Sequence, residues 1–162
     1  MALTVGTNAY LNATAATAYF ADRLRSTAWT AAAAGDRDQA LIQATRLIDA
    51  EDFRGYRAGN NQALAWPRSG KRADNALLDP TVVPAEVLNA VCETALVLLG
   101  TDLYANDDLA NARRVFQQVG PVTKSVEYDG RKGSASRLPD IALKLLAPLL
   151  DGSSGSSAAW VV

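Results

Sequence analysis

The segment from Pro84 to Leu99 most constrains the fold, because it predicts a helix that is apolar around much of its circumference. Pro84 suits the first turn of such a helix, where its missing N–H would be unpaired in any case. The apolar positions recur at helical spacing and comprise Val87, Leu88, Val91, Thr94, Ala95, Leu98 and Leu99. A helix with this much apolar surface is buried, so we place it at the centre of the fold.

Apolar residues at helical spacing predict further helices over about residues 13–25, 36–49 and 139–150. Asp36 and Gln39 have the spacing of a capping box, which predicts that the second of these helices begins at Asp36. An alternating, β-branched stretch predicts a β-hairpin from about Arg114 to Asp129. Glycines and prolines punctuate residues 53–80, which we expect to form a long ordered loop.

These elements predict a mostly α fold, a small helical bundle of about four helices with one β-hairpin. A chain of 162 residues is long enough for one domain with a substantial core, and we place that domain at residues 1–150. Residues 151–162 begin with a run of glycine and serine, which predicts a flexible C-terminal tail. The tail has an apolar tip, Trp160-Val161-Val162.

The composition argues against catalysis. Histidine is absent, which removes the commonest proton-transfer group at neutral pH and the commonest nitrogen ligand of metals. The single cysteine, Cys92, lies in the apolar central helix, where we expect a small buried residue and not a nucleophile. We therefore predict no enzyme, no cofactor and no metal site. A small hydrolase is disfavoured because the sequence offers no convincing nucleophile.

The N-terminal segment lacks a basic region followed by an apolar run, so we expect no signal peptide. Apolar stretches are too short to span a bilayer. These features predict a soluble protein made in the cytoplasm. The net charge of −1 gives no overall attraction to nucleic acid.

The sequence Trp66-Pro67-Arg68 predicts a rigid, extended turn, because proline biases the preceding residue away from helical geometry. Two interpretations are open. Trp66 can anchor a contact with a neighbouring subunit, with Arg68 paired to a carboxylate, since Trp and Arg often dominate interface energies. Alternatively, Trp66 can complete the core of its own protomer beneath the long loop.

Five positive charges and no acidic residue occupy positions 54–72, which is the best local case for nucleic acid, with Tyr56 and Trp66 available to stack on bases. The basic residues are Arg54, Arg57, Arg68, Lys71 and Arg72. The same charges can instead meet an acidic cluster of an adjacent subunit, either residues 49–52 or residues 102–108, as the closure of a ring requires. We favour the contact between subunits and assign to it Arg54, Arg57, Trp66, Arg68, Asp49, Glu51 and Asp52.

Several stretches resemble a family of tailed-bacteriophage proteins. They are Ala18 to Arg23, Ala40 to Asp49, Gln62 to Gly70, Val83 to Val87 and Val119 to Val122 with Val126-Glu127-Tyr128. Members of this family are labelled putative DnaT-like single-stranded-DNA-binding proteins, and they are also similar to head–tail connector, or neck adaptor, proteins. The resemblance covers about Tyr10 to Leu150 and fails over Ala105 to Ala112 and the serine-rich tail.

The resemblance implies a structural virion protein in the neck of the particle. It implies a dodecameric ring docked on the portal, bound to tail or neck proteins, with double-stranded DNA passing through its lumen and no cofactor. On this hypothesis Trp160, Val161 and Val162 contact the portal; a disordered terminus without a partner is the other possibility. The alternative function is that of a single-stranded-DNA-binding replication protein.

Overall fold

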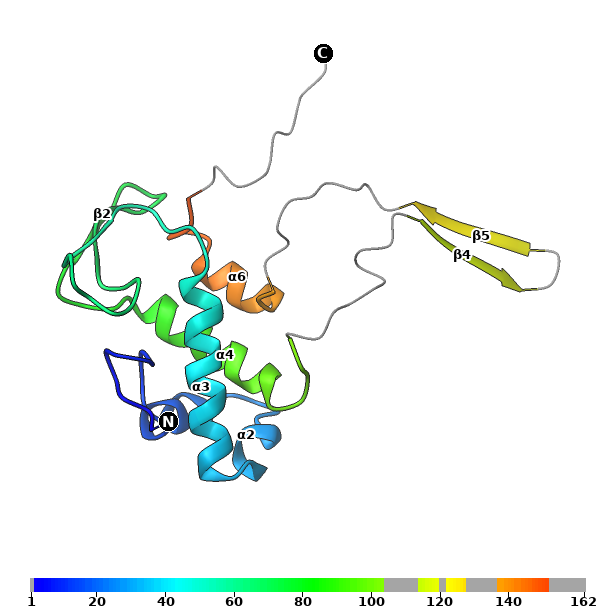
Figure 1. The fold of residues 1–162 in the computed structure, drawn as a ribbon, viewed down its shortest axis with the longest axis horizontal. Coiled ribbons are helices and arrows are strands. Elements are labelled where there is room, and N and C mark those ends of the chain that lie inside the picture. Colours follow the sequence, from blue (N-terminus) through cyan, green and yellow to red (C-terminus); the bar gives the residue numbers. More distant parts are fainter. Residues whose placement is uncertain (1, 104–113, 120–121, 128–136, 152–162) are drawn as a thin grey trace, which may run out of the picture. The chain divides into compact units, whose positions relative to one another are not determined.

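The apolar helix that the sequence places at the centre is central in the structure. The structure is a computed structural model, and it describes residues 2–103, 114–119, 122–127 and 137–151. Helix α4 (Ala85–Leu98) follows Pro84 and packs against α3 (Ala34–Asp49), α6 (Asp140–Leu146) and α1 (Ala13–Ala21). Figure 1 shows α3 in cyan crossing the green α4 steeply, with the orange α6 beside α4. The predicted mostly α bundle with one hairpin is thus confirmed.

The first helix ends four residues earlier than expected, at Ala21. Its start is fixed by Asn12, whose Oδ1 accepts a hydrogen bond of 2.9 Å from the Ala15 N–H. Beyond its end the chain turns through Arg25, at φ 59°, and enters a short helix, α2 (Thr27–Ala31). Trp29 of α2 is buried against Phe20, with ring centroids 4.8 Å apart. Burial of this tryptophan requires the chain to fold back, so α1 stops.

The predicted capping box at Asp36 is wrong. Helix α3 begins at Ala34, and no side chain caps it. Asp36 lies in its first turn, where the helix dipole favours negative charge. Arg37 connects this end of α3 to α2, because its Nε and Nη2 donate to the carbonyls of Trp29 and Thr30 at 2.9 and 2.8 Å.

The segment that we expected to be a loop contains a small antiparallel sheet with the order β1-β2-β3. Its strands are β1 (Tyr56–Arg57), β2 (Arg68–Lys71) and β3 (Leu77–Leu78). They are too short to give an alternating pattern in the sequence. The sheet depends on Gly55, at φ 73°, because a Cβ there would lie 2.2 Å from the Ser69 carbonyl oxygen. The adjacent Trp66–Pro67 peptide bond is cis.

The chain divides into two compact units, residues 1–103 with 136–162 and residues 104–135. The second unit contains the predicted hairpin, which is formed by β4 (Arg114–Val119) and β5 (Val122–Glu127). These strands are antiparallel, with Arg114 opposite Glu127 and Val119 opposite Val122. The expected boundary between a domain at residues 1–150 and a tail at residues 151–162 stays a prediction, because residues 152–162 lie outside the described part of the chain.

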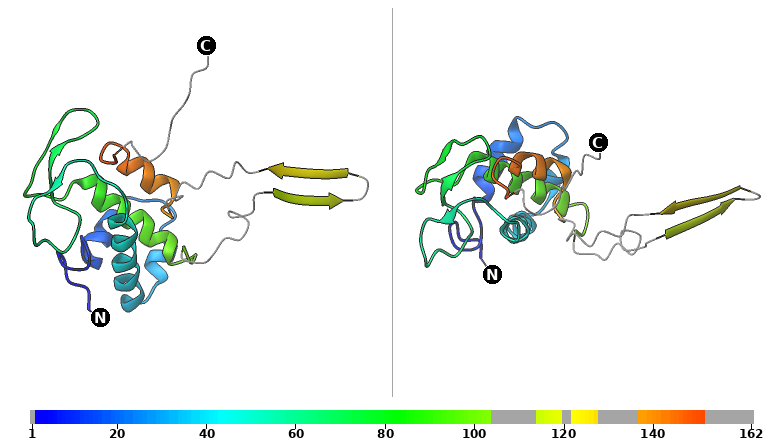
Figure 2. Two further views of the ribbon diagram at one scale, coloured as in Figure 1. Left: turned by 45° about the horizontal axis from the view of Figure 1, so that its top comes forward. Right: turned by 90° about the horizontal axis from the view of Figure 1, so that it is seen from above.

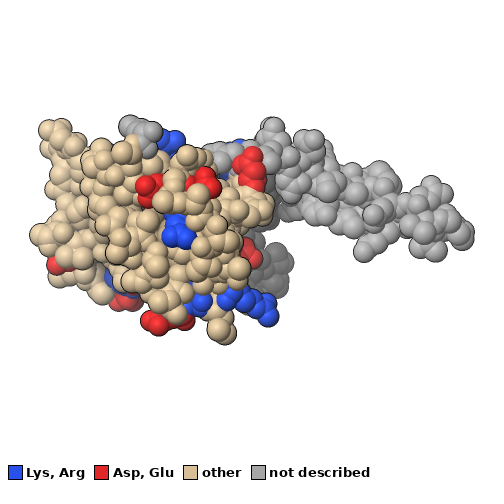
Figure 3. All heavy atoms as spheres, turned by 90° about the horizontal axis from the view of Figure 1, so that it is seen from below, with Lys and Arg blue, Asp and Glu red and all other residues tan. Residues whose placement is uncertain are grey.

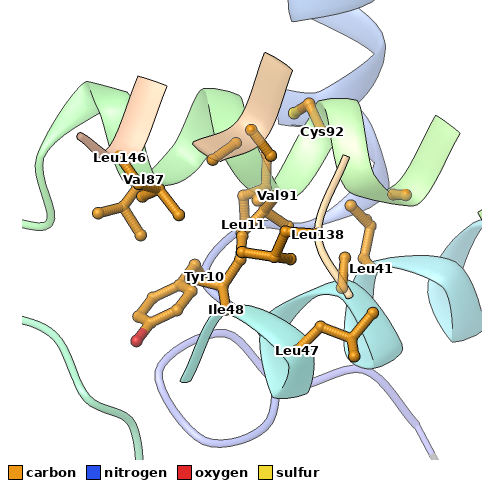
Figure 4. Packing of buried hydrophobic residues seen from close by; sticks show 14 of the residues in the cluster. Tyr10, Leu11, Leu41, Leu47, Ile48, Val87, Val91, Cys92, Leu138 and Leu146 are labelled. Atoms are coloured by element: carbon orange, nitrogen blue, oxygen red, sulfur yellow. The ribbon is translucent and has the colours of Figure 1, made fainter. Parts of the chain in front are cut away.

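The core of the first unit lies where α3, α4 and α6 meet (Figures 2 and 4). Leu41 and Ile48 of α3, Val87 and Val91 of α4 and Leu146 of α6 are buried there. Figure 4 shows Tyr10 beside this cluster, with its hydroxyl pointing away from the aliphatic side chains. The aromatic ring therefore belongs to the core, and its polar end is available to another part of the chain.

One buried charge lies in the centre of α4. Glu93 is almost completely buried, and its carboxylate accepts hydrogen bonds from Arg23 Nε at 2.6 Å and Arg23 Nη2 at 2.8 Å. The Tyr19 hydroxyl donates to the same carboxylate at 2.8 Å. Burial raises the pKa of Glu93, but the hydrogen bonds from Arg23 and Tyr19 outweigh it and leave that pKa below its usual value. This interaction joins α1, and the residues just after it, to α4.

Because the folded-state pKa of Glu93 is lowered, its ionised form stabilises the fold above the pKa of the unfolded chain. That contribution is lost as the pH falls through the lower, folded-state pKa. We expect Glu93→Gln to reduce the free energy of unfolding by about 2 kcal/mol at neutral pH, less than a fully buried pair because Arg23 is partly exposed. The difference from wild type should shrink in acid, as measured by urea unfolding from about pH 7 to about pH 3.

The matched control for this prediction is Asp22→Asn, which removes an exposed carboxylate at the end of α1. Its pH dependence should follow that of the wild type. The explanation would be wrong if Glu93→Gln also kept the pH dependence of the wild type.

Candidate functional site

The segment from Gln62 to Arg68 is held by its own side chains and by neighbouring parts of the chain. Gln62 accepts a hydrogen bond from the Gly59 N–H at 2.9 Å and donates to the carbonyls of Leu64 and Pro67 at 2.8 and 3.0 Å. The side chains of a turn that bond to its backbone in this way fix its shape. The Gln62 side chain of the Gln-Ala-Leu-Ala-Trp-Pro-Arg sequence therefore stabilises the conformation of this turn.

Trp66 is 2% exposed and packs edge-on against Phe53, with ring centroids 5.3 Å apart. This placement agrees with the second of our two interpretations, in which Trp66 completes the core of its own protomer. Its role in a subunit contact stays a prediction, and so little exposed surface leaves it little to contribute. It also cannot stack on a nucleobase in this conformation.

Arg68 binds carbonyl oxygens of its own chain. Its Nε donates to Arg54 O at 2.9 Å, and its Nη2 donates to Phe53 O at 3.0 Å and to Gly55 O at 2.7 Å. Partial burial, followed by the charge of Arg57, lowers the pKa of Arg68. The guanidinium therefore holds the turn before β1 against β2, and within the described residues no carboxylate pairs with it.

Asp49 and Tyr10 connect the end of α3 to this turn. The Tyr10 hydroxyl donates to Asp49 Oδ1 and accepts a hydrogen bond of 3.0 Å from the Trp66 N–H. Asp49 Oδ2 accepts a hydrogen bond of 3.1 Å from the Ala65 N–H. Burial raises the pKa of Asp49, while these hydrogen bonds and the charge of Arg57 oppose the rise. Burial and the hydrogen bond to Asp49 likewise raise the pKa of Tyr10.

Three further residues of the predicted subunit interface, Glu51, Asp52 and Arg54, lie near the C-terminal end of the described chain or at the surface. Glu51 is half-buried and Asp52 is exposed, and the Asp52 carbonyl accepts a hydrogen bond of 2.9 Å from the Asp151 N–H. Arg54 Nε donates to the Leu150 carbonyl at 2.9 Å. The structure thus brings Asp49, Arg68 and Trp66 together through contacts within one chain. A contact between subunits is tested by none of these observations.

The outer face of the small sheet carries exposed apolar and basic side chains. Lys71 and Leu77 are paired across β2 and β3, and paired residues share a face. Both are exposed, and Leu77 is 78% exposed. The next pair, Gly70 and Leu78, faces inward, because successive residues alternate and Leu78 is buried.

The edge strand β1 adds an aromatic ring and a second cation. Tyr56, opposite Ser69, is 81% exposed, and the next residue, Arg57, is also exposed. Adjacent residues of a strand point to opposite faces, so Arg57 lies on the side of the sheet opposite Tyr56. That side faces Asp49, because the charge of Arg57 opposes the rise that burial causes in the pKa of Asp49. This edge therefore presents Tyr56 outward and Arg57 toward the end of α3.

The five basic residues of positions 54–72 are divided between two uses. Arg54 and Arg68 bind main-chain carbonyls, and Arg72 pairs with Glu86 at 2.6 Å and Asp74 at 3.5 Å. In the part of the chain that the structure describes, Arg57 and Lys71 are in no ion pair. Figure 3 shows positive and negative side chains interspersed on the face it presents. A nucleic-acid contact would therefore depend on individual exposed cations such as Arg57 and Lys71.

Possible metal ligands and the single thiol can be placed among the described residues. No group of three or more Cys, Asp and Glu residues there is arranged to hold a metal ion. Cys92 is buried as expected, and burial raises its pKa to about 12. None of the described helices is long and apolar enough to cross a membrane.

Sequence reasoning identified Tyr56 and the basic segment, but it missed Tyr10 and Leu77. Tyr10 precedes the first helix in a stretch with no periodicity, and nothing in the sequence relates it to Asp49. Leu77 lies in a strand of two residues, which is too short for a recognisable pattern.

The chain matches the sequence model of a protein family described as putative DnaT-like ssDNA binding protein over residues 2–162. No curated protein and no solved structure matches it.

This match corrects the expectation of a head–tail connector, because the matched family is described by single-stranded-DNA binding and not by a virion role. The dodecameric ring, the portal and tail partners, and the passage of double-stranded DNA through a lumen are wrong on the same ground. The portal contact that we assigned to Trp160, Val161 and Val162 presupposes this partner, and these residues lie outside the described part of the chain. A location in a virion neck is not tested by the match.

The hydrogen bonds of Tyr10 give a prediction about stability. Tyr10→Phe leaves Asp49 Oδ1 and the Trp66 N–H without a partner in a poorly solvated place. We expect the free energy of unfolding to fall by about 1–3 kcal/mol in urea unfolding. Amide hydrogen exchange at Ala65 and Trp66 should accelerate, because the turn loses an anchor.

The control is Tyr56→Phe, which removes the hydroxyl of an exposed tyrosine and should change stability by less than about 0.5 kcal/mol. Equal stability of the two variants would show that the Tyr10 hydroxyl does not anchor the turn.

Proposed function

Because the chain belongs to the putative DnaT-like ssDNA-binding protein family, we propose that it binds single-stranded DNA across the outer face of the β1-β2-β3 sheet. The observation that carries the proposal is Tyr56, an aromatic ring that is 81% exposed on the same small sheet as the exposed Lys71. On the outer face, Tyr56 stacks on a base and Lys71 contacts a phosphate. Arg57, on the opposite side of the edge strand β1, contacts a phosphate where the DNA passes over that edge.

The chemistry of these residues suits a single strand. Every base has a π face, so stacking on an aromatic side chain tolerates any sequence and contributes about 1–3 kcal/mol per base. Leu77, on the other edge strand, adds apolar surface for a neighbouring base or sugar. Tyr56 and Leu77 share the outer face of the sheet, so both are available to a ligand that lies across it.

The sheet also holds these groups in place before DNA arrives. Arg68 binds three carbonyls of the turn before β1, and Arg54 binds the Leu150 carbonyl. The close approach of Gly55 to Ser69 keeps β1 against β2. A binding face that is already ordered loses less conformational entropy when the ligand binds, which favours binding.

Electrostatics limit the strength of the proposed contact. The net charge of −1 supplies no general attraction, so affinity must come from stacking and from the two cations. Each phosphate contact to a single strand contributes about −0.7 to the slope of log K against log salt concentration. Two contacts give a slope of about −1.4, which is shallow for a nucleic-acid-binding protein.

We propose binding without catalysis. The absence of histidine from the sequence and the burial of Cys92 support this part of the proposal. The exposed groups of the sheet, a phenol and two cations, suit contacts with a base and with phosphates.

The test is fluorescence anisotropy with a labelled oligothymidylate of about 15 nucleotides across a salt series. We expect Tyr56→Ala to weaken binding about tenfold through lost stacking, while Tyr56→Phe keeps the affinity. Lys71→Ala should weaken binding and make the salt slope shallower by about 0.7.

The matched control is Lys144→Ala, which removes an exposed cation from α6 and should leave both affinity and slope unchanged. The proposal would be overturned by wild-type protein that does not bind the oligonucleotide, or by Tyr56→Ala protein that binds it as well as wild type.

A further inference from the structure

A pocket of about 450 Å³ lies beside the C-terminal half of α3. Its volume is within the range of about 300–1,000 Å³ that is typical of small-ligand sites. The outer face of the sheet, to which we assign stacking, does not include it. The pocket is lined by Thr7, Asn8, Thr45, Arg46, Asp49, Ala50, Ala63 and Leu64.

Asp49 gives this pocket a pair of hydrogen-bond acceptors. Each carboxylate has about four lone-pair sites, and the bonds from Tyr10 and the Ala65 N–H occupy one on each oxygen. One acceptor site therefore remains on Oδ1 and one on Oδ2. Because the two existing bonds fix the carboxylate, its remaining acceptor sites are held in place before a ligand arrives.

Arg46 brings donors to the same pocket. It precedes Asp49 by three residues on α3, a spacing that makes the two residues neighbours on the helix surface. Arg46 is exposed, and in the described part of the chain it takes part in no ion pair. Arg46 and Asp49 both line the pocket, and no ion pair joins them.

Among the DNA bases, guanine matches this arrangement. Its Watson–Crick edge has two adjacent donors, N1–H and the N2 amino group, and next to them the acceptor O6. A carboxylate can accept from both donors, and an arginine can donate to O6. Adenine, cytosine and thymine each have only one donor position on that edge.

The wall of the pocket includes part of the chain that connects two strands of the proposed DNA-binding sheet. Ala63 and Leu64 in its wall belong to the connection between β1 and β2. Burial raises the pKa of Asp49, and the charge of Arg57 opposes that rise, which places Arg57 within electrostatic reach of the pocket. A strand stacked on Tyr56 can therefore pass over the edge strand, along Arg57, to the end of α3.

We infer that this pocket binds a guanine base of the single strand, with Asp49 accepting from N1–H and N2 and Arg46 donating to O6. The inference rests on the proposed function and adds a base preference to it. Stacking on Tyr56 supplies affinity for any sequence, and the pocket selects guanine at one position.

The experiment varies the DNA before it varies the protein, since Asp49 also supports the fold. Three oligonucleotides of about 15 nucleotides are compared by anisotropy: all thymidine, one central guanine, and one central hypoxanthine, which lacks the N2 amino group. We expect guanine to improve affinity about tenfold over thymidine, and hypoxanthine to lose most of that gain. Arg46→Ala should reduce the preference for guanine and leave oligothymidylate binding close to that of wild type, whereas Lys144→Ala should keep the preference.

A second measurement locates the base. The amide NMR signals of Thr7, Ala63 and Leu64 should shift with the guanine oligonucleotide and not with oligothymidylate. Equal affinity for all three oligonucleotides, or shifts confined to other residues, would overturn the inference and leave the proposed function standing. Failure to bind oligothymidylate at all would overturn the proposed function, and the inference with it.

Discussion

One shared hydroxyl joins the turn at Trp66 to the helical bundle. Tyr10, which precedes the first helix, donates to Asp49 at the end of α3 and accepts from the main chain of Trp66. Three segments that are distant in the sequence meet at this oxygen atom. Because the tyrosine ring is part of the apolar core, the hydrogen bonds that hold the turn are fixed to the helical bundle. These hydrogen bonds therefore help to position both the small sheet and the pocket beside α3.

The basic segment shows how one composition can serve two purposes. Its charges look alike in the sequence, yet Arg54 and Arg68 bind main-chain carbonyls, Arg72 pairs with carboxylates, and Arg57 and Lys71 remain exposed. Guanidinium groups suit the structural role because several donors in one plane can bind several carbonyls. Fewer basic residues are therefore available for a contact with DNA than a count of charges suggests. Stacking would contribute a correspondingly larger part of the binding free energy.

The family match favours single-stranded-DNA binding over a connector ring, and a contact between subunits stays a prediction. The residues that we assigned to subunit contacts are largely engaged within their own chain: Trp66 in the core, Arg68 on the turn, Asp49 with Tyr10. Tyr56, Leu77 and Lys71 remain exposed on the outer face of the sheet, and Arg57 remains exposed on the other side of its edge strand. That combination suits a ligand with flat faces and negative charges, as a single strand has.

The helical bundle, the central position of α4, the hairpin at residues 114–127 and the burial of Cys92 could all be predicted from the sequence, because long apolar periodicities and alternation are local signals. The aromatic and basic content of residues 54–72 was equally visible there. Which of these residues are exposed was settled by the folded chain alone. The three-stranded sheet, the start of α3 and the environment of Asp49 depend on contacts between distant residues such as Tyr10, Gly55 and Trp29. No local pattern encodes such contacts, so the partner of each side chain became known only from the folded protein.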